Sequence, residues 1–226
     1  MKRKIWSMLL VIGTITSYNA YGQSTNYGID YFRDGQNNLI RKGAYTDVEG
    51  SPFVFGNYMP GKATGTDGKV YDNIKLNYNV YDDVLLFVYD SADKVMKFAN
   101  PIKSFTVYAP APTTFVNNFP TIDKQTNESY YQVLSSNGKT ALLKRYSKVI
   151  NQTKNYDGSE TKKFQDITTY YFFKNNNIAK LTKNQNQVIN ALSDQKEALL
   201  SFSKSNAINF KKDEDLAKLF DYYNTL

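Results

Sequence analysis

The run Asp67-Gly-Lys-Val-Tyr-Asp-Asn-Ile-Lys-Leu-Asn-Tyr-Asn-Val80 joins a turn signal to a regular alternation of side chains. From Val70 to Val80 the even positions are mostly apolar, and the odd positions carry amide, charged and tyrosine side chains. Because successive strand residues point to opposite faces, this alternation predicts a strand with one buried face. The Asp67-Gly68 pair before it favours a tight hairpin turn, since both centres of a type I′ turn need positive φ.

Similar strands are expected along the chain as far as residue 181. Val84–Tyr89 is apolar on both faces and is interpreted as a more central strand. Pro110-Ala-Pro112 and the polar residues 151–163 are interpreted as loops. The other predicted strands are 95–99, 104–108, 130–134, 140–146, 167–173 and 178–181. Short strands at this spacing predict a mainly β fold, either an antiparallel meander or sandwich or an open barrel-like sheet.

The hydrophobic period changes after residue 181 and predicts two C-terminal α-helices. Thr182-Lys-Asn-Gln185 fits a capping box, and apolar residues follow at helical spacing from 188 to 202. Asp213-Glu-Asp215 is expected at the start of the second helix, where the helix dipole favours negative charge. We expect the apolar stripes of this helix pair to pack on the β domain.

The first residues have the pattern of a secretory signal peptide. Lys2-Arg-Lys4 precedes an apolar run at 5–15, and Ala20-Tyr-Gly22 places small residues before a cut between Gly22 and Gln23. The alternative is an uncleaved membrane anchor, but the run is about half of the ~20 residues that a spanning helix needs. The chain is therefore predicted to be exported to the periplasm or the cell surface, with no transmembrane segment after cleavage.

These signals divide the chain into four predicted parts. Residues 1–22 are the signal peptide, and 23–49 are a flexible N-terminal segment that could supply one early strand. Residues 50–181 form the antiparallel β domain, and 182–226 form the helix pair packed on it.

The composition excludes several kinds of chemistry. The chain has no histidine and no cysteine. This excludes Ser-His-Asp and Cys-His catalysis, zinc sites built from His and Cys, and thiol redox chemistry, because each requires one of these residues. We predict no cofactor, no metal site and no catalytic residue. Residues 1–22 hold three of the 28 basic residues and none of the 21 acidic ones, which leaves a net charge of +4. This small, scattered excess does not favour nucleic-acid binding, which usually concentrates positive charge on one face.

Two kinds of side chain remain as functional candidates. The carboxylate pairs Asp82/Asp83 and Asp90/Asp93 could serve a hydrolase, although both lie at predicted turns, where Asp is common for structural reasons. Tyr71 lies on the predicted polar face of its strand and could contact a sugar or a protein partner. The alternative for Tyr71 is burial in the sheet, as expected for most of the 19 tyrosines.

The run from Asp67 to Val80, followed by Asp83-Val-Leu85, resembles secreted proteins common in the Bacteroidota. The tail from Ile208 to Asn224 is similar to the helical end of many of those proteins. The resemblance covers residues 50–226 and implies a lineage and an architecture. It implies no activity, so it transfers no catalytic residue. In that lineage Asp90-Ser91-Ala92 resembles an O-glycosylation acceptor, which makes Ser91 a candidate modification site.

Three functions are compatible with the sequence. The first is a non-enzymatic exported protein that binds or scaffolds an envelope protein or a glycan. The second is a periplasmic carrier that holds an apolar ligand between its sheet and helices. The third is a carboxylate-dependent hydrolase.

Overall fold

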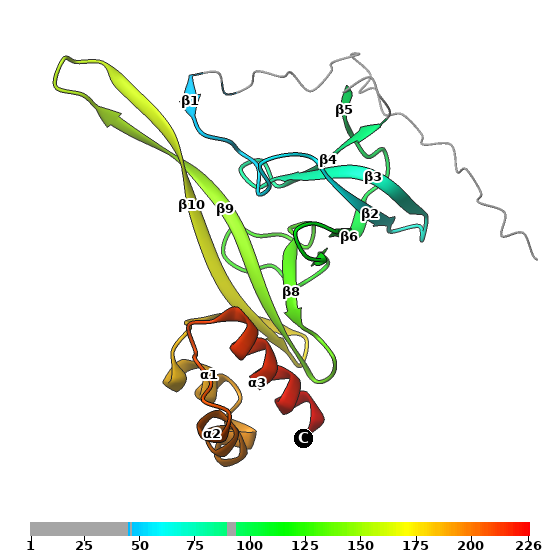
Figure 1. Ribbon diagram of the computed structural model, residues 1–226, viewed down its shortest axis with the longest axis vertical. Helices are drawn as coiled ribbons and strands as arrows, with labels where there is room; N and C mark the ends of the chain where they lie inside the picture. Colours follow the sequence, from blue (N-terminus) through cyan, green and yellow to red (C-terminus); the bar gives the residue numbers. More distant parts are fainter. Residues whose placement is uncertain (1–44, 46, 90–93) are drawn as a thin grey trace, which may run out of the picture.

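The computed structural model describes residues 45, 47–89 and 94–226, and the chain is mainly β (Figure 1). Eleven strands form one open mixed sheet in the order β1-β10-β9-β8-β7-β6-β2-β3-β4-β5, with β11 also paired to β10. The expected antiparallel pairing is found between neighbouring strands except for β1, which pairs parallel with β10. The strands are β1 Val48–Glu49, β2 Met59–Gly65, β3 Val70–Asn79, β4 Val84–Tyr89, β5 Lys94–Lys97, β6 Ile102–Val107, β7 Thr113–Val116, β8 Tyr131–Ser135, β9 Thr140–Lys154, β10 Glu160–Lys174 and β11 Asn177–Leu181.

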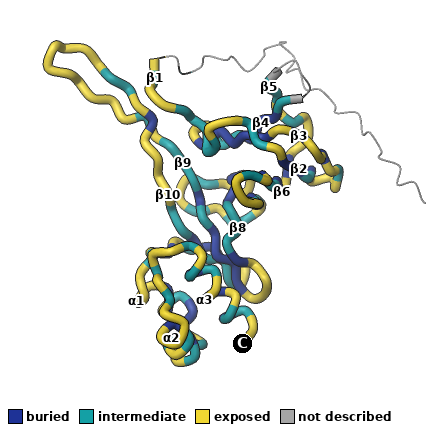
Figure 2. Tube along the Cα trace, viewed as in Figure 1, coloured by how far each residue is buried: buried dark blue, intermediate teal, exposed yellow. Residues whose placement is uncertain are grey.

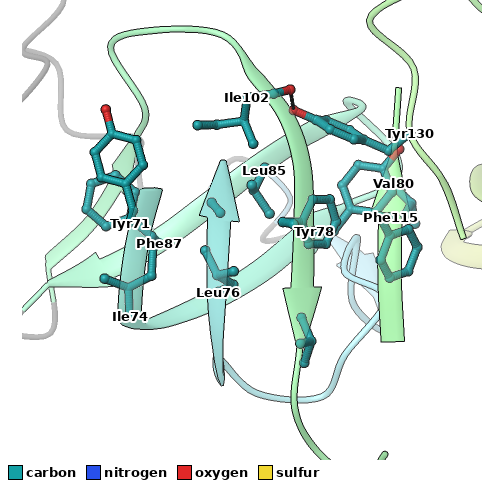
Figure 3. Packing of buried hydrophobic residues seen from close by; sticks show 13 residues of the cluster. Tyr71, Ile74, Leu76, Tyr78, Val80, Leu85, Phe87, Ile102, Phe115 and Tyr130 are labelled. Atoms are coloured by element: carbon teal, nitrogen blue, oxygen red, sulfur yellow. Dashed lines mark hydrogen bonds between the residues drawn. The ribbon is translucent and has the colours of Figure 1, made fainter. Parts of the chain in front are cut away.

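Strands β2 to β7 enclose an aromatic core (Figure 3). Tyr78 is at its centre and makes edge-to-face contacts with Phe105, Phe115 and Tyr130, at ring-centroid distances of 5.8, 5.8 and 5.6 Å. This geometry suits aromatic rings, which bury a large apolar area and attract one another edge to face. Part of the aromatic content of the sequence thus fills this core.

Two strands of this half of the sheet were missed by the sequence analysis. β2 lies between β6 and β3, although its sequence Met-Pro-Gly-Lys-Ala-Thr-Gly has little β propensity. At Gly61 a Cβ atom would lie 2.3 Å from the carbonyl oxygen of Thr106, so glycine is needed for the strands to approach. β7 begins at Thr113, directly after the proline segment that was interpreted as a loop.

The β9–β10 hairpin is the longest element of the molecule and corrects a second interpretation. Residues 151–163 were expected to form a polar loop, yet the two strands stay in register from Thr140↔Lys174 to Lys154↔Glu160. One end of the hairpin lies against the helices, and the other extends away from the rest of the sheet (Figure 1). We call residues 147–167 of this hairpin the arm.

Three helices follow the sheet, where a pair was expected. The first predicted helix is divided into α1 Gln185–Ala191, a 3-10 turn at Ser193–Gln195 and α2 Lys196–Ser205. The predicted capping box at Thr182 is wrong, because the side chain of Asn184 caps α1 by accepting from the backbone N–H of Gln187 at 2.9 Å. α3, Asp213–Thr225, begins at the acidic run as predicted.

The helices cover the end of the sheet formed by β8, β9 and β11. Their buried side chains form one cluster with Leu142 of β9 and Leu181 of β11. The last turn of α3 is held to the hairpin by Asn224, which accepts from the backbone N–H of Thr140 at 2.9 Å and donates to its carbonyl at 3.0 Å. Because Asn224 satisfies both backbone groups of Thr140, the helix is fixed in one register on the sheet.

Candidate functional site

Tyr71 is not the exposed aromatic residue that the alternation predicted. Its exposed fraction is 6 %, whereas Val70, placed on the apolar face by the sequence, is 47 % exposed. A β-bulge explains the reversal: Asn73 has φ +52 and the β2–β3 register shifts between Gly61 and Ala63. The extra residue moves the side chains before it to the opposite face. Tyr71 packs edge-to-face on Phe98 at 5.1 Å, so its proposed ligand role is wrong.

Other candidate residues lie outside the part of the chain that the structure describes. These are the cleavage site at Gly22 and Gln23, the acceptor Ser91 and the pair Asp90/Asp93. They remain predictions from the sequence.

Asp82 belongs to the turn between β3 and β4 and is held by two neighbours. The hydroxyl of Tyr45 donates to its carboxylate at 2.7 Å, and the amide of Asn79 donates at 2.8 Å. Burial, together with the neighbouring Asp82, raises the pKa of Tyr45, so its hydroxyl stays protonated and keeps donating at neutral pH. These contacts give Asp82 a structural role, because they fix the turn to the segment that precedes β1.

Asp83 is the centre of a more buried polar cluster in the same turn. Its carboxylate accepts hydrogen bonds from the hydroxyl of Tyr78, from Ser129 Oγ at 2.6 Å and from Arg145 Nη2 at 3.0 Å. Arg145 also donates to the carbonyl of Tyr130 at 3.2 Å. The cluster therefore ties the β3–β4 turn, the segment before β8 and strand β9 together.

The chemistry of this cluster is that of a structural ion pair. Burial raises the pKa of Tyr78 well above its ordinary value, so the phenol is a donor and not a base. Ser129 donates to a carboxylate that already has two other donors, which makes Asp83 a poor general base for activating that hydroxyl. Asp82 and Asp83 thus have their side chains in separate structural contacts, and the hypothesis of a catalytic pair at this turn gains no support.

A second ion cluster joins the helices to the sheet at the first residue of α3. The Asp213 carboxylate accepts from Lys144 and Lys183, both at 2.7 Å, and from the hydroxyl of Tyr170 at 2.8 Å. Burial alone would raise the pKa of Asp213, but these three donors outweigh it and the pKa is lowered. The position at a helix N-terminus further favours the charged form. The cluster was not predicted, because its members come from β9, β10, α3 and the segment before α1.

The arm is the most exposed paired structure among the described residues (Figure 2). Val149 and Ile167 are 43 % and 39 % exposed, and the side chain of Tyr156 at the tip is fully exposed. Since Val149 pairs with Gln165 and Ile167 pairs with Ser147, the two apolar side chains are diagonal neighbours on one face. The arm thus presents apolar side chains to solvent away from the hydrophobic cores.

The tip of the arm is ordered by its own hydrogen bonds. The backbone N–H of Asn155 donates to the carbonyl of Ser159 at 2.8 Å, and the N–H of Gly158 donates to the carbonyl of Asn155 at 3.0 Å. The carboxylate of Asp157 accepts from the hydroxyl and the N–H of Ser159 at 2.6 and 2.9 Å. The Asp157-Gly158 pair is the signal that could have identified this hairpin from the sequence.

The arm is braced where it leaves the body. Phe164 packs edge-to-face on Tyr45 and on Tyr81, both at 5.4 Å. Lys162 pairs with Asp47 at 2.7 Å, next to the short parallel ladder between β1 and β10. These contacts hold the lower part of the arm against the β3–β4 turn and leave its outer part in solvent.

Two features are absent from the part of the chain that the structure describes. No group of three or more Asp or Glu residues in this part of the chain is arranged to hold a metal ion. No described helix has the length and apolar character required to cross a membrane.

Comparison of the chain with protein-family models, curated proteins and solved structures finds no match. The resemblance to secreted Bacteroidota proteins therefore stays a prediction.

Proposed function

We propose that this protein is a non-enzymatic exported protein that binds a partner at the cell envelope through the arm. The observation that carries the proposal is the arm itself: a paired hairpin that is braced at its base, ordered at its tip and exposed along its outer part. A rigid element loses little conformational entropy on binding, which favours its use as a contact surface.

Tyr156 is the side chain on which this proposal depends most. It is fully exposed at the tip, while its neighbours Asn155 and Asp157 are engaged in the hydrogen bonds of the turn. Aromatic residues in fixed positions are frequent anchors of protein interfaces, because they bury much area for few rotatable bonds. This supports a protein partner that contacts the ring of Tyr156.

The alternatives have weaker support from the same structure. In the cluster between the helices and the sheet, Leu142, Val188, Leu216 and Phe220 pack on one another with no exposed surface, which favours a binding protein over a carrier. The carboxylates of Asp82 and Asp83 serve structural contacts, which favours it over a hydrolase. Export rests on the leader pattern at 1–22 and is tested by N-terminal sequencing of the protein from the envelope fraction, where Gln23 is expected first.

The binding proposal is tested by photo-crosslinking in the native host. A photoreactive phenylalanine derivative replaces Tyr156 in one strain and Tyr108, an exposed tyrosine of the body, in a control strain. We expect a discrete crosslinked species, identified by mass spectrometry, from position 156 and not from position 108. No crosslink from position 156, or the same products from both positions, would contradict an arm-mediated contact.

A further inference from the structure

The two edges of the β9–β10 hairpin differ along the arm. The outer edge of β10 is covered by β1 at Lys162–Lys163 and by β11 from Tyr170 to Lys174. The outer edge of β9 is paired with β8 as far as Lys144. Beyond that residue, no strand of the described chain pairs with β9 on the side away from β10.

The free edge is widest at 149–154, where the side chains are exposed except for the half-buried Ile150. At ~3.4 Å per residue this stretch is about 20 Å long, the length of an ordinary strand. Its sequence Val-Ile-Asn-Gln-Thr-Lys contains no proline or glycine, and half of its residues are β-branched. Such an edge presents unpaired backbone N–H and C=O groups that can accept another strand.

We infer that this edge pairs with the same edge of a second copy of the chain, β9 against β9, about a two-fold axis near Gln152. The inference deepens the proposed function, and it rests on the arm being the contact element. A two-fold antiparallel pairing satisfies both free edges at once and leaves no new edge, so the assembly closes as a dimer.

The charge pattern of the edge favours this register. With Gln152 opposite itself, Asn151 faces Thr153 and Ile150 faces Lys154, so no like charges are directly opposed. The aliphatic stem of Lys154 can lie along Ile150 while its ammonium group stays in water. Centring the axis on Asn151 instead would place Lys148 opposite Lys154, which like-charge repulsion disfavours.

The absence of cysteine makes a direct test possible. The exported chain is purified with the substitution Gln152→Cys or, as the control, Tyr156→Cys, and is oxidised at equal concentrations. Facing residues of paired strands have Cβ atoms ~4.5–5.5 Å apart, close enough for a disulfide after small adjustments. In the same register the two residues at position 156 would lie about 27 Å apart.

We expect a disulfide-linked dimer from Gln152→Cys and much less from Tyr156→Cys, although position 156 is the more exposed. Sedimentation of the unmodified chain should show a concentration-dependent dimer. The variant Gln152→Lys should raise the dissociation constant of the dimer about fivefold, because like charges then meet at the two-fold axis. Gln165→Lys, an exposed site on β10 away from the edge, should leave it unchanged.

The pairing of two copies would be overturned if the chain were a monomer at all concentrations. It would also be overturned if Tyr156→Cys, at the more exposed position, gave at least as much disulfide-linked dimer as Gln152→Cys. If the purified chain is monomeric while position 156 still crosslinks to another protein in the envelope, the inferred dimer is wrong. The proposed function then stands with that other protein as the partner. If the chain is monomeric and the envelope crosslink is also absent, both are wrong.

Discussion

The two halves of the β9–β10 hairpin have the same ladder and opposite environments. In the half near the helices, Leu142 and Leu143 have no exposed surface and Tyr171 is buried between neighbouring rings. In the outer half, residues 151–160 are all exposed. An isolated two-stranded ribbon is at best marginally stable in water, so the outer half depends on its turn and on its braces. The comparison shows that continuous strand pairing does not by itself indicate where the stability of a sheet resides.

The largest difference between the halves is expected from core truncation. Leu142→Ala removes buried methyl groups from the contact between sheet and helices and should lower the free energy of unfolding by about 4 kcal/mol. Val149→Ala, the matched change on the arm, should alter it by less than about 0.5 kcal/mol. Urea unfolding of the two variants measures both values. Similar losses for both would mean that the arm folds as part of the core.

The next largest effect is expected at Asp83. Asp83→Ala leaves the buried guanidinium of Arg145 without its counter-charge and should cost about 3 kcal/mol of unfolding free energy. Lys162→Ala removes an ion pair of the arm, with side chains 36 % and 65 % exposed, and should lower the free energy of unfolding far less than Asp83→Ala, because solvent screens the pair. Chemical denaturation gives both numbers, and equal effects would contradict the distinction between a buried and an exposed pair.

A smaller difference is expected in acid. Lowering the pH should weaken the contact between helices and sheet more than the tip of the arm. The pKa of Asp213 is lowered in the folded protein, so its stabilising effect is complete above the unfolded value of ~3.9 and is lost as pH falls through the folded value. Unfolding midpoints between pH 5 and pH 2 should therefore fall less steeply in Asp213→Asn than in the unmodified chain. Hydrogen bonds from Ser159 also lower the pKa of Asp157, but this carboxylate is exposed to solvent, so Asp157→Asn should flatten the slope much less than Asp213→Asn. An equal flattening in both variants would contradict this assignment.

The smallest effect is expected at the tip itself. Gly158 has φ +85 and its Cβ position is open, so Gly158→Ala should cost about 1 kcal/mol through backbone strain and not through a clash. We expect faster amide hydrogen exchange near 155–161 and little change for the amides of β9 near Leu142. Gly158→Asn is the control, since Asn tolerates positive φ better and should exchange more slowly than the alanine variant.

Local sequence patterns predicted much of this fold. They gave wrong predictions where the conformation of a strand depends on its neighbours in the sheet. Ile74, Leu76 and Tyr78 are buried as the alternation predicted, although Asn77 and Asn79 on the opposite face are buried as well. The acidic start of α3 lies where the sequence placed it.

The predicted exposure of Tyr71 was wrong because the bulge at Asn73 moves its side chain to the other face of the strand. Alternation with a period of two residues does not reveal a bulge. The sequence did not predict β2 because proline and glycine disfavour a strand, whereas in the folded sheet the lack of a Cβ at Gly61 lets β2 approach Thr106 of β6 closely.

The candidate contact surface was the least predictable feature. Residues 151–163 are polar, and polarity alone indicates a loop as readily as a solvated hairpin. Their pairing continues because the Asp157-Gly158 turn sets the register and because Phe164 is held between Tyr45 and Tyr81. Those tyrosines lie far from Phe164 in the chain, so a reading limited to neighbouring residues could not include them.

The sequence by itself determined the mainly β class, the positions of most turns, the C-terminal helical region and the absence of histidine and cysteine chemistry. These properties follow from local periodicity and composition, which act over a few residues. Tertiary structure alone decided the burial of Tyr71, the pairing of Asp83 with Arg145, the ion cluster at Asp213 and the extension of the arm. Each depends on contacts between segments far apart in the chain, whose energies exist only once the sheet has brought those segments together.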